Sequence, residues 1–472
     1  MKAKFYILIA AAALLSVSCE KFLDEHLKGG YSSENYYTSE SKAEMAVNAI
    51  YNSLYGNTLW MFGDVASDDS VKGGDDGDQP QINEINDLTA TADNGSLGSF
   101  WQDSYETIAR ANNAIANIQS MSMDDALKAR LIGEAKFLRA YTYFNLVNIF
   151  GQVPLKTRPQ NNAADIHVAL SPVASIYAQI DQDLTDAAAG LTDLKDGHAN
   201  RSAAYALLAK SKVFQQKWDE ALQAINNFKT VGAGYGLEPN YADLFKTGGE
   251  DSVEAIFTIR YATNKIASVG NNLNVWFAPF VEGGYHFNAP TQDYVNCFTE
   301  KTVGGDDDPR LDASIGRAGK PWFNDTVFDA TWSSATGYLV KKYDEDAVED
   351  MAKSQSAVPQ HRIRYAEVLL LEAEALNEAA ATNVGTAAAV LDQVRNRAQL
   401  APTPAATQAA LRDAIRVERR RELGFEFHRF FDVMRYGQAY ATAALGAAAW
   451  PADRYYFPIP QGETDANAAL KN

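Results

Sequence analysis

Alanine-rich helix pairs constrain the fold of this chain more than any other feature. Residues 203–228 and 364–398 each combine two helical patterns around a turn. The same twelve-residue interval separates Ala209 from Ala221 in the first pair and Ala375 from Ala387 in the second. Small residues at this separation let two antiparallel helices approach closely, and KWDEALQAI in the first pair is similar to the tetratricopeptide pattern. We therefore predict a scaffold of helical hairpins. The alternative is that two alanine-rich pairs coincide by chance.

Apolar residues at three- and four-residue steps predict further helices. This periodicity covers residues 43–54, 100–118, 126–150 and 173–191. Before the last of these helices, we expect Ser171 to be the N-cap and Pro172 to take the first helical position. Together the patterns predict one mainly α-helical domain over residues 41–472.

Residues 232–345 have a different character. Glycine, asparagine, aspartate and aromatic residues replace the alanine and leucine periodicity, and one strand-like alternation runs through Ala255, Phe257, Ile259 and Tyr261. Long irregular segments inside a domain tend to be functional. We therefore expect this loop-rich insertion to hold the ligand-binding part.

The first residues, MKAKFYILIAAAALLSVSC, predict an export signal. Two lysines precede an apolar run that is too short to cross a bilayer comfortably, and small residues follow it up to Cys19. We predict a signal peptide over residues 1–18, a lipid on Cys19 and a polar tether over residues 19–40. A cleaved signal without a lipid is the alternative. With Cys19 acylated, Cys297 is left as a single unpaired thiol that we expect to be buried.

An arginine-rich segment stands out in an otherwise acidic chain. The formal net charge is −18, so nucleic acid is not an expected partner. Residues 415–437, IRVERRRELGFEFHRFFDVMRYG, nevertheless contain six arginines. On a helix the opposite charges three residues apart would be Glu418 and Arg421, Glu426 and Arg429, Arg429 and Asp432, and Asp432 and Arg435. If the four phenylalanines bury the segment, its guanidiniums can bridge carboxylates and backbone carbonyls. We interpret it as structural and not as a catalytic patch.

Sequence motifs for catalysis or metal binding are missing. The six histidines are scattered without a metal-binding spacing, and no nucleophile elbow, phosphate-binding loop or dinucleotide fingerprint occurs. The acidic stretch DDSVKGGDDGDQP at 68–80 offers oxygen atoms to Ca²⁺ but lacks the spacing of an EF-hand loop. We predict a solvated acidic loop there, no cofactor and no metal site, with Ca²⁺ left as an alternative.

Six motifs, in order along the chain, resemble the SusD/RagB family of outer-membrane nutrient-binding lipoproteins. They are the lipoprotein start, SPVASIYAQIDQDLTDAAAGL, RSAAYALLAKSKVFQQKWDEAL, DDDPR at 306–310, IRYAEVLLLEAEALNEA, and VERRRELGFEFHRFFDVMRYG followed by FPIPQGE. The resemblance implies a SusD-like fold with tetratricopeptide-like hairpins and a location on the outer face of the outer membrane. It further implies a SusC-like TonB-dependent transporter as partner and a glycan, or in some members a peptide, as ligand. No chemical step is implied.

A glycan site needs flat aromatic faces for the C–H face of a sugar ring and polar groups for its hydroxyls. Three of the seven tryptophans lie between residues 276 and 332. We predict a platform of Trp276, Tyr285, Trp322 and Trp332, with Asp69 and Asn324 as hydroxyl partners. The alternative for these aromatic residues is a small core of the insertion itself. Two alternatives to a glycan receptor also stay open, namely a peptide receptor and a surface glycoside hydrolase.

Overall fold

The computed structural model describes residues 36–56, 58–195, 197–262, 269–333, 335–346, 352–446 and 455–470. The predicted signal peptide, Cys19 and the predicted tether up to residue 35 lie outside the described residues. Within the described ranges, no helix is both long and apolar enough to cross a membrane.

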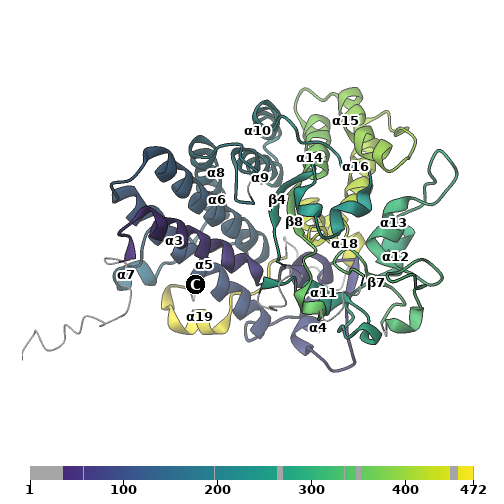
Figure 1. The fold of residues 1–472 in the computed structure, drawn as a ribbon, viewed down its shortest axis with the longest axis horizontal. Coiled ribbons are helices and arrows are strands. Elements are labelled where there is room, and N and C mark those ends of the chain that lie inside the picture. Colours follow the sequence, from purple (N-terminus) through teal and green to yellow (C-terminus); the bar gives the residue numbers. More distant parts are fainter. Residues whose placement is uncertain are drawn as a thin grey trace, which may run out of the picture.

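Four long helices form the N-terminal part of the scaffold. They are α3 (Glu40–Asn52), α5 (Gly95–Ser120), α6 (Asp125–Phe150) and α8 (Val173–Gly190), which pack together on the left of Figure 1. Side-chain caps begin three of them: the side chains of Ser39, Asn94 and Asp124 accept hydrogen bonds from the first-turn amides of α3, α5 and α6. The four helices predicted from periodicity are confirmed.

The predicted start of α8 is wrong in one detail. Pro172 is the N-cap, and Ser171 belongs to the short strand β3 (Leu170–Ser171). Ser171 lies one residue before the N-cap, and its backbone pairs with Val153 of β2 (Val153–Pro154) instead.

The two predicted helical hairpins are confirmed and lie on one another. The first consists of α9 (Arg201–Phe214) and α10 (Trp218–Val231), and the second of α14 (Tyr365–Glu378) and α15 (Val384–Arg397). Ala209, Ala221, Ala375 and Ala387 are all fully buried. Ala221 and Ala375 share one apolar cluster, so the small residues join the hairpins as well as the helices within each. Helix α16 (Gln408–Leu423) packs against both helices of the second hairpin.

The loop-rich insertion is built from short elements, on the right of Figure 1. The elements within residues 232–345 are η4 (Tyr241–Phe245), η5 (Gly249–Asp251), β4 (Ala255–Ile259), α11 (Leu273–Phe277), η7 (Phe280–Glu282), β5 (Phe287–Pro290), α12 (Gln292–Asn296), α13 (Pro309–Ser314), β6 (Ile315–Gly316), η8 (Ala330–Trp332) and β7 (Leu339–Val340). The remaining short elements are η2 (Ser53–Tyr55), η3 (Met61–Val65), α4 (Pro80–Asn86), α7 (Ala163–Ile166), η9 (Lys353–Gln355), α17 (Arg429–Arg435), α18 (Gln438–Leu445), α19 (Gln461–Ala466) and η11 (Ala468–Leu470).

Antiparallel strand pairs connect the insertion to distant parts of the chain. Strand β5 pairs with β1 (Ser70–Gly73), and β4 pairs with β8 (Gln360–Arg364), which leads into helix α14. The strand predicted from alternation is confirmed over 255–259, with Tyr261 beyond its end. Its side chains from Ile256 to Ile259 are all buried, so the alternation does not mark one buried and one exposed face.

The arginine-rich segment 415–437 is not one continuous helix. Helix α16 ends at Leu423 and α17 begins at Arg429, and between them Phe425 and Phe427 have φ of 62° and 67°. Gly424 lies in this turn because a Cβ there would collide with the ring of Tyr294. The four phenylalanines of the segment are buried, as the structural interpretation requires.

The break in the helix changes the predicted charge pairs. Glu418 with Arg421 and Asp432 with Arg435 are within ion-pair distance, at 3.9 and 2.8 Å. Glu426 lies in the turn and pairs instead with Lys342 and Arg364, at 2.7 Å each. Arg429 pairs with Asp68, also at 2.7 Å.

A buried ion network joins the scaffold to the insertion. The Arg364 side chain is 1% exposed and donates to Glu254 at 2.5 Å, Glu422 at 2.6 Å and Glu426 at 2.7 Å. Arg310 of α13 also reaches Glu422, at 2.9 Å. Burial by itself would raise the pKa of Glu426, but Arg364 and Lys342 lower it to about 2. Glu426 is therefore charged at neutral pH, whereas burial raises the pKa of Glu254. Together the three carboxylates compensate buried guanidiniums from both parts of the fold.

Arg364→Met tests the weight of this network. Methionine fills a similar space but leaves three buried carboxylates without their common partner, which costs about 3–5 kcal/mol of the free energy of unfolding. Arg412→Met is the matched control, because Arg412 pairs with Glu378 at 2.6 Å with a third of its side chain exposed. That change is expected to cost about 1 kcal/mol or less. Denaturant unfolding followed by circular dichroism measures both, and equal losses would contradict a central role for Arg364.

Candidate functional site

Two adjoining cavities open in the loop-rich insertion. The larger has a volume of about 800 Å³ and is lined by residues 321–327 and 344–346 together with Lys246 and Thr247. The smaller has a volume of about 610 Å³ and is lined by Asn274, Val275, residues 281–283, Tyr285, Asn324, residues 345–346 and residues 352–354. Asn324, Glu345 and Asp346 line both cavities and form their shared wall. Volumes in this range suit a ligand of several rings.

A tight hairpin positions Asn324 in the shared wall. The amide of Trp322 donates to the Thr326 carbonyl at 2.9 Å, and the Thr326 amide donates to the Phe323 carbonyl at 3.1 Å. Asn324 and Asp325, at the tip, have φ of 54° and 57°. Asparagine and aspartate tolerate this left-handed conformation, which two-residue hairpin turns require. The backbone N–H of Asn324 also donates a hydrogen bond to the carboxylate of Asp346 at 2.6 Å, which ties the tip to the opposite segment.

Trp322 anchors this hairpin more than it offers a face to a ligand. Its side chain is 6% exposed and packs with Phe328 and Leu339 in a small apolar cluster, with Trp332 half-buried against it. The Trp322 Nε1–H donates to Glu282 at 2.8 Å, which connects the hairpin to the wall of the smaller cavity. The alternative of a small aromatic core for the insertion thus holds for Trp322 and Trp332, although Trp322 also lines the larger cavity.

Tyr285 is the predicted aromatic residue with the most accessible ring. It is 51% exposed, lines the smaller cavity and stands edge-on to Trp276, with ring centroids 5.7 Å apart. Trp276 is half-buried in α11 and packs against Trp60 and Phe287, so it supports Tyr285 from behind. Phe280 and Val281 precede Tyr285 by five and four residues in the chain, and they are 72% and 64% exposed. Val281 lines the same cavity as Tyr285 and adds an exposed apolar side chain that sequence reasoning did not predict.

Acidic groups dominate the polar side of the cavities. Lys353 lies between two carboxylates, 2.7 Å from Glu282 and 2.5 Å from Asp344. Burial raises the pKa of Asp344 to about 7. Glu345 accepts a hydrogen bond from the hydroxyl of Thr247 at 3.0 Å, which connects the shared wall to the η4–η5 connection.

Asp69 lies away from the cavities, contrary to its predicted place beside the platform. It is fully buried, and its carboxylate pairs with Arg420 at 2.5 Å, while neighbouring Asp68 pairs with Arg429. Two of the acids at the start of the acidic stretch therefore serve the arginine-rich segment and are not part of a solvated loop.

Within the described ranges, no group of three or more histidine, cysteine, aspartate or glutamate side chains is arranged to hold a metal ion. Cys297 is unpaired and only partly buried, with a pKa that burial raises to about 12.

The structure therefore divides the predicted site residues into three groups. Tyr285, Trp322 and Asn324 line the two cavities, whereas Trp276 and Trp332 support them from behind, and Asp69 belongs elsewhere. Sequence reasoning missed the acidic wall of Glu345 and Asp346 and the paired Glu282 and Lys353. The adjacent Asn324-Asp325 was the available signal for the hairpin turn.

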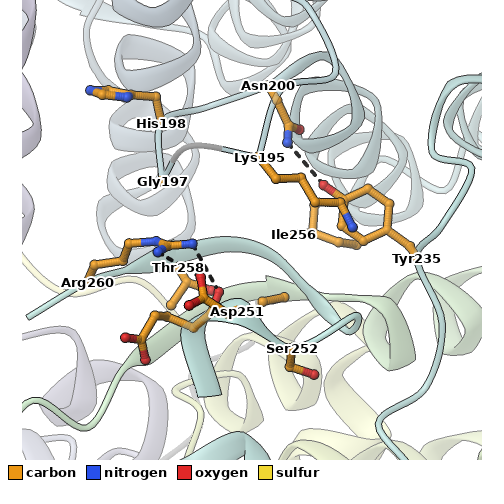
Figure 2. A pocket seen from close by; sticks show the side chains of 12 residues that line it. Lys195, Gly197, His198, Asn200, Tyr235, Asp251, Ser252, Ile256, Thr258 and Arg260 are labelled. Carbon is orange, nitrogen blue, oxygen red and sulfur yellow. Dashed lines mark hydrogen bonds and ion pairs between the residues drawn. The ribbon is translucent and has the colours of Figure 1, made fainter. Parts of the chain in front are cut away.

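A separate pocket on the scaffold side is a weaker candidate for an extended ligand. Figure 2 shows it between the connection that follows α8 and strand β4. Its volume is about 180 Å³, and its one described tyrosine, Tyr235, is covered by Lys195, whose Nζ lies 3.5 Å from the ring centroid. Arg260 points to Asp251 across the pocket floor, with an ion pair of 2.9 Å. The pocket is small and its groups already interact with one another.

Comparisons with known proteins agree with the fold. A family model described as the SusD family matches residues 253–472, and one described as starch-binding associating with outer membrane matches residues 21–213. A SusD-like protein (P2) of Formosa agariphila is 27% identical over 477 residues, covering 92% of this chain and 90% of that protein.

Two solved structures are similar over nearly their whole length. One is a laminarin-binding SusD-like protein, with a TM-score of 0.77 and 27% identity over 91% of this chain and 98% of that chain. The other is a SusD-like carbohydrate-binding protein from Bacteroides fragilis, with a TM-score of 0.80 and 28% identity over 92% of this chain and 99% of that chain. The predicted fold class, a mainly helical SusD-like fold, is confirmed.

Stability measurements distinguish anchoring from accessible aromatic residues. Trp322→Ala removes a buried ring and the hydrogen bond to Glu282, so we expect it to cost on the order of 3 kcal/mol of the free energy of unfolding. Tyr285→Ala removes a half-exposed ring and is expected to cost about 0.5 kcal/mol or less. Denaturant titration of both variants measures the difference. A Trp322→Ala protein as stable as the wild type would show that this ring is not an anchor.

Proposed function

Because the chain belongs to the SusD family, we propose that it captures glycan chains at the cell surface and passes them to a SusC-like TonB-dependent transporter. The observation that carries this proposal is the pair of adjoining cavities with an accessible ring, Tyr285, on one side and a polar wall, Asn324, Glu345 and Asp346, between them.

The chemistry of these cavities suits carbohydrate. The ring of Tyr285 and the exposed Phe280 and Val281 give apolar surface for the C–H face of a pyranose. Asn324 and the carboxylates of the shared wall supply acceptors and donors for the hydroxyls around such a ring. Because the wall borders both cavities, one bound chain can contact it with two successive sugar units.

The similar proteins support the same ligand class. The SusD-like structure of 27% identity is a laminarin-binding protein, and the one of 28% identity is a carbohydrate-binding protein. The family model over residues 21–213 is described as starch-binding associating with outer membrane. We carry the ligand class, a glycan, over to this chain as part of the proposal, together with an outer-membrane location through a lipid on Cys19.

Capture alone needs no chemical step. A few stacked rings and hydrogen bonds, less the entropy of ordering a flexible oligosaccharide, predict a Kd between about micromolar and millimolar. Such binding permits release, which a receptor that feeds a transporter requires.

Affinity gel electrophoresis against a polysaccharide panel that includes laminarin and starch tests the ligand. We expect retardation by at least one glycan, no new reducing ends after incubation, and a loss of about tenfold or more in affinity for Tyr285→Ala. Tyr36→Ala, an aromatic change four residues before α3 that lines neither cavity, is the control and should bind like the wild type. New reducing ends would indicate a hydrolase, and binding of peptides without any glycan would indicate a peptide receptor.

Co-purification tests the proposed partner. The full-length chain, co-expressed with a SusC-like outer-membrane transporter from the same organism, should be recovered as a complex after detergent extraction. Cys19→Ala should reduce its membrane association, because the lipid supplies the anchor. A chain that stays monomeric in the presence of the transporter would contradict the handover.

A further inference from the structure

We infer that the two cavities select by charge, accepting uncharged sugar units and rejecting carboxylated or sulfated ones, with Glu345 and Asp346 as the residues that determine this specificity. The inference rests on the proposed function, because it concerns the class of glycan that the same site takes.

The first observation is the balance of charge in the lining. Five acidic residues line the cavities, namely Glu282, Asp325, Asp344, Glu345 and Asp346, against two lysines, Lys246 and Lys353. An anionic ligand would therefore enter a negative field, and the formal net charge of −18 on the whole chain adds to it.

The second observation is that both lysines are already compensated. Lys353 lies between the carboxylates of Glu282 and Asp344, at 2.7 and 2.5 Å. Lys246 pairs with Asp243, outside the cavities, at 2.7 Å. Nearby Lys341 donates to the carbonyl of Pro321 at 2.8 Å and lies over the rings of Trp322 and Phe323. Each lysine that lines the cavities is thus already paired with at least one carboxylate, so neither adds an uncompensated positive charge to the lining.

The third observation concerns hydrogen-bond acceptors that lack a donor. Among the described residues, Asp344 Oδ2 and Glu345 Oε1 are buried without any hydrogen-bond partner, and both residues line the larger cavity. Because burial raises the pKa of Asp344 to about 7, that group can carry its own proton, and Glu345 is the acceptor for which a missing donor is costly. A sugar hydroxyl can supply a donor to this wall. A carboxylate or a sulfate has no proton to supply and adds a like charge.

The shared wall concentrates this preference at the position where both cavities meet. Glu345 uses one carboxylate oxygen to accept from Thr247, and Asp346 uses one to accept from the Asn324 amide. In both of these contacts the donor is a neutral group. A ligand that spans the two cavities passes both groups, so the wall acts on whichever sugar unit lies between them.

A comparison of neutral with anionic polysaccharides tests the inference. Affinity gels would contain laminarin, amylopectin and xyloglucan on one side, and alginate, polygalacturonate and heparan sulfate on the other, in a buffer of low ionic strength. Retardation by a neutral polymer, with binding of every anionic one at least tenfold weaker, supports the inference. Retardation by an anionic polymer alone overturns it while leaving glycan binding intact. If no polymer of either class binds, the proposed function fails and the inference fails with it.

A variant pair separates charge from shape. The affinity for the retained neutral polymer and the affinity for its carboxymethyl derivative are measured for two proteins. These are the wild type and the double variant Glu345→Gln/Asp346→Asn. We expect the double variant to bind the derivative several-fold more tightly than the wild type does, and added salt to reduce the difference because it screens the repulsion. Asp219→Asn, an exposed acid on α10, is the control and should change nothing. A discrimination that neither salt nor the double variant reduces would show that shape and not charge excludes the derivative.

Discussion

Buried guanidinium–carboxylate contacts determine where the loop-rich insertion sits. Arg364, at the start of α14, reaches Glu254 beside β4, Glu422 at the end of α16 and Glu426 in the following turn. Such contacts specify geometry more than they add net stability, because the cost of removing the charges from water offsets most of their attraction. The sheets of this segment have only two strands each, so the buried ion pairs are needed to hold the segment in its position.

The cavities inherit their shape from this network. Lys342 pairs with Glu426 of the turn, and the Tyr343 hydroxyl donates to the Phe425 carbonyl at 3.1 Å. The chain continues directly into Asp344, Glu345 and Asp346, so the acidic wall follows two residues that are fixed to the centre of the fold. The opposite side of the larger cavity is a hairpin with its own aromatic anchor, Trp322. The candidate ligand site is thus a gap between two supported segments, and neither segment is a long helix or a sheet.

The distribution of aromatic residues separates support from recognition. Most of the rings predicted as a platform stand behind the surface, where they replace the apolar core that a short-stranded segment lacks. Tyr285 remains accessible and lines the same cavity as the exposed Val281. A candidate site with little aromatic face and a carboxylate wall would hold a glycan through many weak contacts, in keeping with the proposed capture and release. The same wall gives the candidate site its electrostatic character.

The sequence by itself determined the scaffold, because helical periodicity and alanine spacing are local patterns that the structure reproduces at α3, α5, α6, α8 and both hairpins. It also indicated which segment would be irregular and that the arginine-rich stretch is structural. Only the tertiary structure decided that this stretch breaks at Gly424 against Tyr294, that Asp69 pairs with Arg420, and that Glu345 and Asp346 meet Asn324 across two cavities. These features depend on contacts between residues far apart in the chain. The sequence alone does not distinguish an aromatic or acidic residue that is buried from one that is exposed.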